Sequence, residues 1–275
     1  MKKDYIPVTK DTSCPEKDFI DQYWTQIWDK VVDDNPDLGY EENEMFKIIS
    51  PFIYSLKGNA QILDGGCGLG KWTAHFFRKG YNVTGIDISQ KTIGRLNELF
   101  PNLNFKVADI RKTKFEDESF DAYYSWGVFE HFEVGLGPCF QEARRILKKG
   151  GYLFVSVPYQ NYRHLRRGNK DLSNWDKHFD AKVGYKTSMR FYQYRLTKIE
   201  LKREFEINGF KCLKVEPIAK KNGIIRMLND VFNIKPSSKL CKITTRLLIP
   251  LVPKDYISHM ILGIGYKKNE NIDSD

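Results

Sequence analysis

A predicted strand that runs into a glycine-rich turn is the feature that most constrains the fold of this chain. The strand is expected over 61–64, and Gly66, Gly68 and Gly70 follow it at every second position. Glycine allows a sharp turn and lets a ligand approach main-chain atoms that a Cβ would screen. A helix is predicted from Lys71, and a strand, a glycine turn and a helix N-terminus together favour a nucleotide-containing ligand. A dinucleotide is not indicated, because its G-x-G-x-x-G spacing requires glycine at position 71.

The residues after this turn predict alternating strands and helices. Strands are expected at 61–64, 82–87, 104–108, 120–125 and 151–157, and helices at 71–79, 89–100 and 138–148. Such alternation requires a parallel sheet with helices on both of its faces. We therefore predict an α/β protein with a Rossmann-like, doubly wound sheet.

Regions on either side of this core define the expected domain organisation. Residues 1–58 are predicted to form an N-terminal helical cap, because apolar residues recur at helical spacing over 19–31 and a second helical stretch covers 44–56. Residues 59–275 are expected to form the ligand-binding domain, with insertions at about 159–195 and 218–257.

Charge and cysteine usage narrow the class of protein. The formal net charge is +9, which suggests an anionic partner without identifying it. The five cysteines are scattered and form no C-x-x-C pair, which disfavours a disulfide framework or a zinc site and favours a reducing compartment. The first residues lack the apolar core of a signal peptide, and no apolar run is long enough to span a membrane. We expect a cytoplasmic protein without a resident metal.

Several segments resemble those of a known superfamily. Asp64 followed by alternate glycines resembles the first motif of class I S-adenosylmethionine (SAM) methyltransferases. The segments 115–131 and 143–151 resemble the fourth-strand region and the helix end before the fifth strand of the same superfamily, in the same order. The resemblance covers residues 60–158 and is closest to the small-molecule group that includes the ubiquinone- and menaquinone-type enzymes. It implies a SAM-dependent methyltransferase whose sheet ends in an antiparallel strand.

The resemblance assigns roles to acidic residues at the ends of the predicted strands. Asp87 lies roughly 20 residues beyond the glycine turn, where a carboxylate can accept hydrogen bonds from both ribose hydroxyls; the alternative is a helix cap. Asp109 would accept from the adenine amino group while Ile110 packs on the ring; the alternative is a solvated turn. Asp64 would orient the glycine turn or hold the amino group of the cofactor. The predicted cofactor-binding residues are Asp64, Gly66, Cys67, Gly68, Gly70, Asp87, Ile88, Asp109, Ile110 and Trp126.

His131 is the predicted general base, since it follows the fourth strand at the edge of the sheet where ligands bind. The alternative is a histidine that only hydrogen-bonds the backbone, and His164 and His178 are weaker candidates for the base. A base is optional for methyl transfer. Positioning of the reactants can contribute about 7–11 kcal/mol, and a base typically adds about 10²–10⁴-fold.

The two insertions are expected to meet the acceptor or a partner. The segment 159–195 is rich in aromatic residues and arginine, which suit a ring and a phosphate or carboxylate, unless it is an ordinary packed excursion. The segment 218–257 holds eight basic and two acidic residues, a net charge of +6, interleaved with apolar ones. Such a segment can lie on an anionic membrane surface. The alternative is a helical pair that packs against the sheet or a partner subunit, with its lysines in solvent.

These features predict a cytoplasmic SAM-dependent methyltransferase, peripheral to the membrane, that methylates a hydroxyl of a small or lipid-linked acceptor. A sugar or a prenyl-lipid precursor would fit that description. An RNA methyltransferase is one alternative, because the basic charge suits phosphate contacts, although no RNA-binding module is recognisable. A non-catalytic SAM-binding subunit of a complex is the other. The sequence does not identify the acceptor atom or the oligomeric state.

Overall fold

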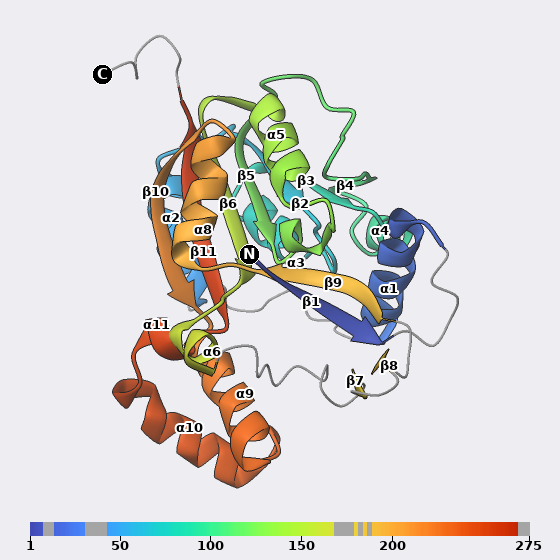
Figure 1. Ribbon diagram of the computed structural model, residues 1–275. Helices are drawn as coiled ribbons and strands as arrows, with labels where there is room; N and C mark the ends of the chain where they lie inside the picture. The colour runs from blue at the N-terminus through green and yellow to red at the C-terminus, as the bar shows by residue number, and fades with distance from the viewer. Residues whose placement is uncertain (8–13, 31–42, 168–178, 181–183, 186–188, 269–275) are drawn as a thin grey trace.

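The computed structural model describes residues 1–7, 14–30, 43–167, 179–180, 184–185 and 189–268, and its centre is a seven-stranded sheet (Figure 1). In spatial order the strands are β10 (Phe210–Ile218), β11 (Met260–Lys267), β6 (Leu147–Pro158), β5 (Phe120–Trp126), β2 (Gln61–Gly65), β3 (Asn82–Asp87) and β4 (Asn104–Val107). Neighbouring strands from β6 to β4 run parallel, whereas β11 is antiparallel to both β6 and β10. The prediction of a doubly wound, mostly parallel sheet with an antiparallel last strand is confirmed.

Helices cover both faces of this sheet. The helices next to the core are α1 (Glu16–Lys30), α2 (Glu44–Tyr54), α3 (Lys71–Arg78), α4 (Gln90–Leu99), α5 (Gly137–Ile146) and α8 (Lys198–Ile207). Leu63 of β2 packs in a cluster with α5 and α8, whereas the adjacent Ile62 packs in a second cluster with α2 and α3. Successive side chains of a strand point to opposite faces, so each apolar strand requires cover on both sides.

One predicted boundary differs from the structure. The helix expected over 138–148 ends at Ile146, and β6 begins at Leu147. Leu147 is fully buried and pairs with Phe120 of β5. Sheet pairing therefore ends this helix before the two glycines at 150 and 151 that the prediction used as its stop signal.

The helical cap predicted over 1–58 requires a correction at its start. Two helices are present as expected, but residues 2–7 form a strand, β1 (Lys2–Pro7), which pairs antiparallel with β9 (Met189–Arg195). The buried Asp4 accepts a hydrogen bond from Arg195 Nε at 2.6 Å, across 191 positions of the chain. Local periodicity cannot reveal a strand whose partner is so distant in sequence.

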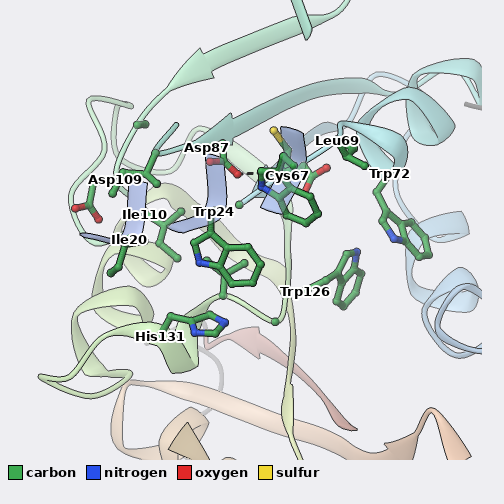
Figure 2. A pocket seen from close by; sticks show the side chains of 18 of the residues that line it. Ile20, Trp24, Cys67, Leu69, Trp72, Asp87, Asp109, Ile110, Trp126 and His131 are labelled. Carbon is green, nitrogen blue, oxygen red and sulfur yellow. Dashed lines mark hydrogen bonds between the residues drawn. The ribbon is translucent and has the colours of Figure 1, made fainter. Parts of the chain in front are cut away.

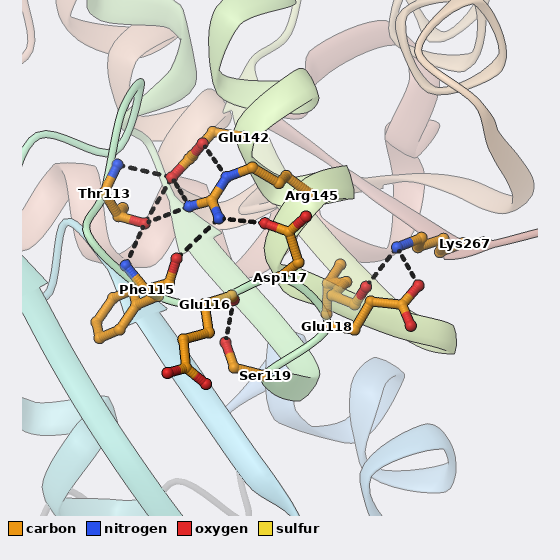
Figure 3. Close-up of polar contacts among 10 residues, drawn as sticks. Thr113, Phe115, Glu116, Asp117, Glu118, Ser119, Glu142, Arg145 and Lys267 are labelled. Carbon is orange, nitrogen blue, oxygen red and sulfur yellow. Dashed lines mark hydrogen bonds and ion pairs between the residues drawn. The ribbon is translucent and has the colours of Figure 1, made fainter.

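A network centred on Arg145 fastens the loop between β4 and β5 to α5 (Figure 3). Arg145 donates to Glu142 Oε1 at 2.7 Å, to Asp117 Oδ1 at 2.6 Å and to the Phe115 carbonyl at 2.8 Å. Glu142 Oε1 also accepts from the backbone N–H of Thr113 at 2.7 Å. The loop that follows β4 is therefore held against the sheet by charge-assisted hydrogen bonds.

The insertion at 159–195 is described in part. It contains α6 (Tyr162–Arg167), the short paired strands β7 (Phe179–Asp180) and β8 (Gly184–Tyr185), and β9. The later part of the insertion thus contributes β9, which the sequence analysis read as irregular, as the partner of β1.

The insertion at 218–257 forms a helical hairpin that projects away from the sheet (Figure 1). Its helices are α9 (Lys220–Phe232) and α10 (Lys239–Leu251), followed by the short α11 (Lys254–Ile257). The hairpin has a small core of its own, made of Ile224, Leu228, Cys241 and Ile257. No helix in the described parts of the chain is long and apolar enough to cross a membrane.

Candidate active site

A cavity of about 340 Å³ lies beside the carboxyl ends of β2, β3 and β5 (Figure 2). This edge of an open α/β sheet is where ligands bind, and the volume is at the lower end of the range for small-molecule sites. Ten of the eleven residues predicted for cofactor binding or catalysis line it, namely Asp64, Gly66, Cys67, Gly68, Asp87, Ile88, Asp109, Ile110, Trp126 and His131. The fold therefore brings together side chains that the sequence places over nearly seventy positions.

The eleventh residue, Gly70, lies outside the lining. Gly66, Gly68 and Gly70 all have left-handed backbone angles, with φ of 79°, 50° and 69°. Gly70 begins α3, and a Cβ there would lie 2.8 Å from the ring of Phe105. Its position thus demands glycine for the turn and for close packing, and the structure shows no side of it facing the cavity.

Asp87 braces the glycine turn from the end of β3. Its Oδ2 accepts from the backbone N–H of Gly68 and its Oδ1 from that of Ser89, both at 3.0 Å. Burial raises the pKa of Asp87, although these N–H groups partly offset that effect. Each carboxylate oxygen can accept more than one hydrogen bond, so the side chain can hold the turn and still receive hydroxyl groups from a ligand.

Asp64 lies at the end of β2 beneath the same turn. It is buried and accepts a hydrogen bond from Thr73 Oγ1 at 2.7 Å. Burial raises its pKa to about 7, so the carboxyl is divided between the protonated and ionised forms near neutral pH. A cationic group in the cavity would favour the ionised form.

Asp109 forms an ion pair that the sequence analysis did not foresee. Arg111 Nη2 lies 2.8 Å from Asp109 Oδ2, and Arg111 Nη1 lies 2.6 Å from Glu16 Oε2 on α1. Partial burial alone would raise the pKa of Asp109, but the hydrogen bonds from Arg111 prevail and lower it. The carboxylate is therefore ionised, partly satisfied, and connected to α1. The Asp-x-Arg spacing in the sequence could have predicted the contact between Arg111 and Asp109. No sequence signal indicates the contact between Arg111 and Glu16.

Tryptophan side chains form the rest of the wall. Four of the five tryptophans in the chain line the cavity, namely Trp24, Trp28, Trp72 and Trp126. Trp24 and Trp28 stack with ring centroids 5.5 Å apart, and Trp72 and Trp126 are also 5.5 Å apart. The indole N–H groups of Trp28 and Trp126 are buried without a hydrogen-bond partner among the described residues. Because buried donors are normally satisfied, both are suited to a polar atom of a ligand.

His131 lines the cavity from a 3₁₀ turn, η2 (Phe129–His131), that follows β5. Its Nδ1 lies 2.7 Å from the carbonyl oxygen of Tyr192. A carbonyl only accepts, so Nδ1 carries the proton in the neutral ring, and the backbone of Gly127 also interacts with the imidazole. Burial lowers the pKa of His131 to about 4, which keeps the ring neutral at pH 7. Of the other histidines considered, His164 lies in α6 and does not line the cavity, and His178 is outside the described residues.

Glu130 is a second titratable group at this turn, and the sequence analysis missed it. It is almost fully buried, its Oε2 has no hydrogen-bond partner in the described structure, and its Oε1 lies 3.9 Å from His131 Nε2. Burial raises the pKa of Glu130 to about 8, so the carboxyl is mainly protonated at neutral pH. Its neighbour Phe129 is also buried, and an acidic residue inside an apolar run was the signal that could have identified it.

Among the described residues, no group of three or more histidine, cysteine or acidic side chains is arranged to hold a metal ion. The polar groups around the cavity include carboxylates, which accept hydrogen bonds, and the indole N–H groups of Trp28 and Trp126, which donate them. These suit a ligand that has hydroxyl and amino groups and a flat ring.

Known proteins share the segment that carries this site. Residues 63–155 match the family model described as a methyltransferase domain. The sterol 24-C-methyltransferase ERG6B of Gibberella zeae is 34% identical over 107 residues, which are 36% of this chain and 28% of that protein. A 2-methyl-6-phytyl-1,4-hydroquinone methyltransferase of Synechocystis sp. is 34% identical over 106 residues, which are 37% of this chain and 33% of that protein. The match thus spans about a third of the length of these relatives.

Solved structures extend the likeness of the fold to most of the chain. Geranyl diphosphate C-methyltransferase of Streptomyces coelicolor A3(2), solved with Mg²⁺, geranyl diphosphate and S-adenosyl-L-homocysteine, superimposes with a TM-score of 0.59. The alignment covers 93% of this chain and 100% of that one at 14% identity, which is evidence for a shared fold and not for a shared acceptor.

Proposed function

Residues 63–155 match a methyltransferase domain, and we propose that this protein transfers a methyl group from SAM to a hydroxyl of a small or lipid-linked acceptor. SAM, the cofactor of this domain, supplies an activated methyl group. The observation that carries the proposal is a cavity that has carboxylates and the glycine turn on one side and the paired rings of Trp24 and His131 on the other (Figure 2).

The polar end of the cavity fits the cofactor. Asp87 would receive the ribose hydroxyls while it holds the glycine turn, and Asp64 would balance the charge of the amino group. Asp109 would accept a hydrogen bond from the adenine amino group in competition with Arg111. Ile88 and Ile110 would pack against the flat faces of the cofactor. The buried indole N–H of Trp126 offers one further donor to a ligand in the cavity.

The aromatic end favours a flat or apolar acceptor. Indole rings exclude water and supply large rigid contact surfaces, which is how a reacting hydroxyl would be positioned. His131 would take the hydroxyl proton on Nε2, since its Nδ1–H is fixed by the Tyr192 carbonyl. A pKa of about 4 makes this ring a weak base at neutral pH. Positioning of the reactants, rather than removal of the proton, would then account for most of the rate enhancement.

A lipid-linked acceptor would be presented at a membrane surface, and a prenyl-lipid precursor or a lipid-linked sugar meets the chemistry of the site. The sterol and phytyl-hydroquinone relatives act on lipid-like molecules by their names, which is compatible with this class. An RNA acceptor is less favoured, because Lys71 is the only lysine or arginine among the residues that line the cavity in the described structure, whereas RNA binding combines aromatic stacking with a positively charged groove.

Incubation of the purified protein with methyl-labelled SAM and fractionated cell extract tests the proposal. We expect label in the organic-phase or small-molecule fraction, and mass spectrometry would identify the methylated product. Label confined to RNA would replace the proposal with the RNA alternative. Binding of SAM without transfer of label to any fraction would instead support the alternative of a non-catalytic SAM-binding subunit.

A further inference from the structure

The hairpin of α9 and α10 carries an apolar stripe on its outer surface. Leu240, Ile243, Leu247 and Leu251 recur at intervals of three and four residues and therefore share one face of α10. Their side chains are 58%, 59%, 64% and 75% exposed. We call these four residues the outer face of α10.

The hairpin does not need this face for its own folding. The opposite side of α10 supplies Cys241 and Thr245, which are buried, and Cys241 packs against Ile224 and Leu228 of α9. Of the eighteen large apolar side chains that are exposed in the described structure, seven lie between Val231 and Leu251. Exposed apolar residues are normally scattered singly, and a cluster of them marks an interaction surface.

Basic residues accompany the outer face, and acidic ones are absent from the same segment. Residues 231–251 contain Lys235, Lys239, Lys242 and Arg246 and no Asp or Glu. Lys239, Lys242 and Arg246 also recur at three and four, so they occupy the neighbouring face of α10. All are exposed, and none forms an ion pair within the described residues. The charges are therefore available to an anionic partner.

We propose that the outer face of α10 docks this protein on an anionic lipid bilayer, with the helix parallel to the membrane plane. In that orientation the leucine and isoleucine side chains enter the boundary between headgroups and acyl chains. The neighbouring lysines and arginine reach the lipid phosphates. The charge of the segment is complementary to the bilayer, and α10 lies in the hairpin that projects away from the central sheet (Figure 1). Docking does not depend on which acceptor is methylated.

Co-sedimentation of the full chain with vesicles tests the docking. We expect binding to vesicles of phosphatidylcholine mixed with phosphatidylglycerol at low salt, little binding to phosphatidylcholine alone, and release as salt rises. The fourfold variant Lys235→Gln, Lys239→Gln, Lys242→Gln, Arg246→Gln should lose more than about a hundredfold in partitioning, since each basic residue near the surface is worth about fivefold. The double variant Ile243→Gln, Leu247→Gln should lose about tenfold or more by removing apolar insertion.

A matched control separates docking from general charge. The variant Lys57→Gln, Lys112→Gln, Lys114→Gln, Lys149→Gln removes the same charge from exposed lysines outside the hairpin and should bind vesicles as the native protein does. The circular dichroism spectrum should be unchanged in every variant. The affinity for S-adenosylhomocysteine, which would bind in the cavity, should be unchanged as well. These two measurements distinguish failure of docking from failure of the fold or of the proposed activity.

Three results would overturn the proposal. One is a native protein that ignores the anionic vesicles at low salt. Another is an equal loss of binding in the Lys57 control set. The third is a native dimer in sedimentation velocity that dissociates in the Ile243→Gln, Leu247→Gln variant without any vesicle binding, because the outer face would then be covered by a second copy of the chain.

Discussion

The two ends of the cavity are built in different ways. At the polar end, Asp64 and Asp87 terminate adjacent strands and are held by hydrogen bonds from nearby residues, such as Gly68 and Thr73. At the aromatic end, Trp24 comes from α1 and contacts His131 at a ring distance of 5.0 Å, and His131 is itself oriented by a carbonyl 61 positions later in the chain. The polar end is built at the edge of the sheet, whereas the aromatic end combines His131, which follows β5, with residues of α1 and β9.

This difference indicates how the site divides its tasks. The matched methyltransferase segment, residues 63–155, includes the polar end but not α1 or β9. Changes at the aromatic end should therefore alter the acceptor step while binding of the cofactor is retained.

The largest effect is expected for the protonation of Glu130, beneath the aromatic end. A carboxyl whose pKa is raised in the folded state contributes stability below its unfolded pKa and loses it as the pH rises through the folded value. With a folded pKa of about 8, the native protein should lose on the order of 4 kcal/mol relative to Glu130→Gln between pH 5 and pH 9. Urea unfolding of both proteins at the two pH values measures this difference. A difference that does not change with pH would show that Glu130 is not buried as a neutral acid.

The next effect concerns turnover. His131→Ala should lower kcat by about 10²-fold, which corresponds to roughly 3 kcal/mol, if its Nε2 receives the acceptor proton. The affinity for S-adenosylhomocysteine should stay within a few-fold, because His131 belongs to the aromatic end. His164→Ala is the matched control and should leave both quantities unchanged, since His164 lies outside the cavity. A parallel loss of cofactor affinity in His131→Ala would contradict the separation of the two ends.

Asp87→Ala should lower the affinity for the cofactor and leave the acceptor step intact. Removing a carboxylate that accepts charge-assisted hydrogen bonds should weaken binding of S-adenosylhomocysteine by about 1.5–3 kcal/mol, measured by titration calorimetry. The acceptor KM at saturating SAM should change little. Unaltered cofactor binding would remove Asp87 from the proposed ribose contact and leave it only the brace of the glycine turn.

The smallest effect is expected for Trp24→Ala. Loss of one stacking surface should weaken acceptor binding by about 0.5–1.5 kcal/mol, which appears as a higher acceptor KM. The affinity for S-adenosylhomocysteine should be unchanged. Because four tryptophans line the cavity, quenching of intrinsic fluorescence reports cofactor binding in the same samples. An acceptor KM equal to that of the native enzyme would place the acceptor elsewhere in the cavity.

The sequence by itself determined the sheet and most of the residues around its edge. The strands near 61, 82, 104 and 120 could be predicted because short strand-like segments alternate with helical ones, and the parallel arrangement follows from the helices between them. Asp64, Asp87 and Asp109 could be identified because they follow predicted strands at positions to which the resemblance to SAM methyltransferases assigns acidic residues, and because the carboxyl ends of parallel strands meet at one edge. Each of these inferences uses contacts between residues that are near in sequence or related by the regular geometry of the sheet.

Only the tertiary structure decided how the aromatic end is assembled and what the acidic groups pair with. The ion pair of Arg111 with Glu16 and the placement of Trp24 and Trp28 over the cavity depend on where α1 packs, and no local pattern fixes that position. The burial of Glu130 and the pairing of β1 with β9 are likewise products of long-range packing. Periodicity in a sequence shows which face of an element is apolar, but the free energy of packing the whole chain selects the surface against which that face lies.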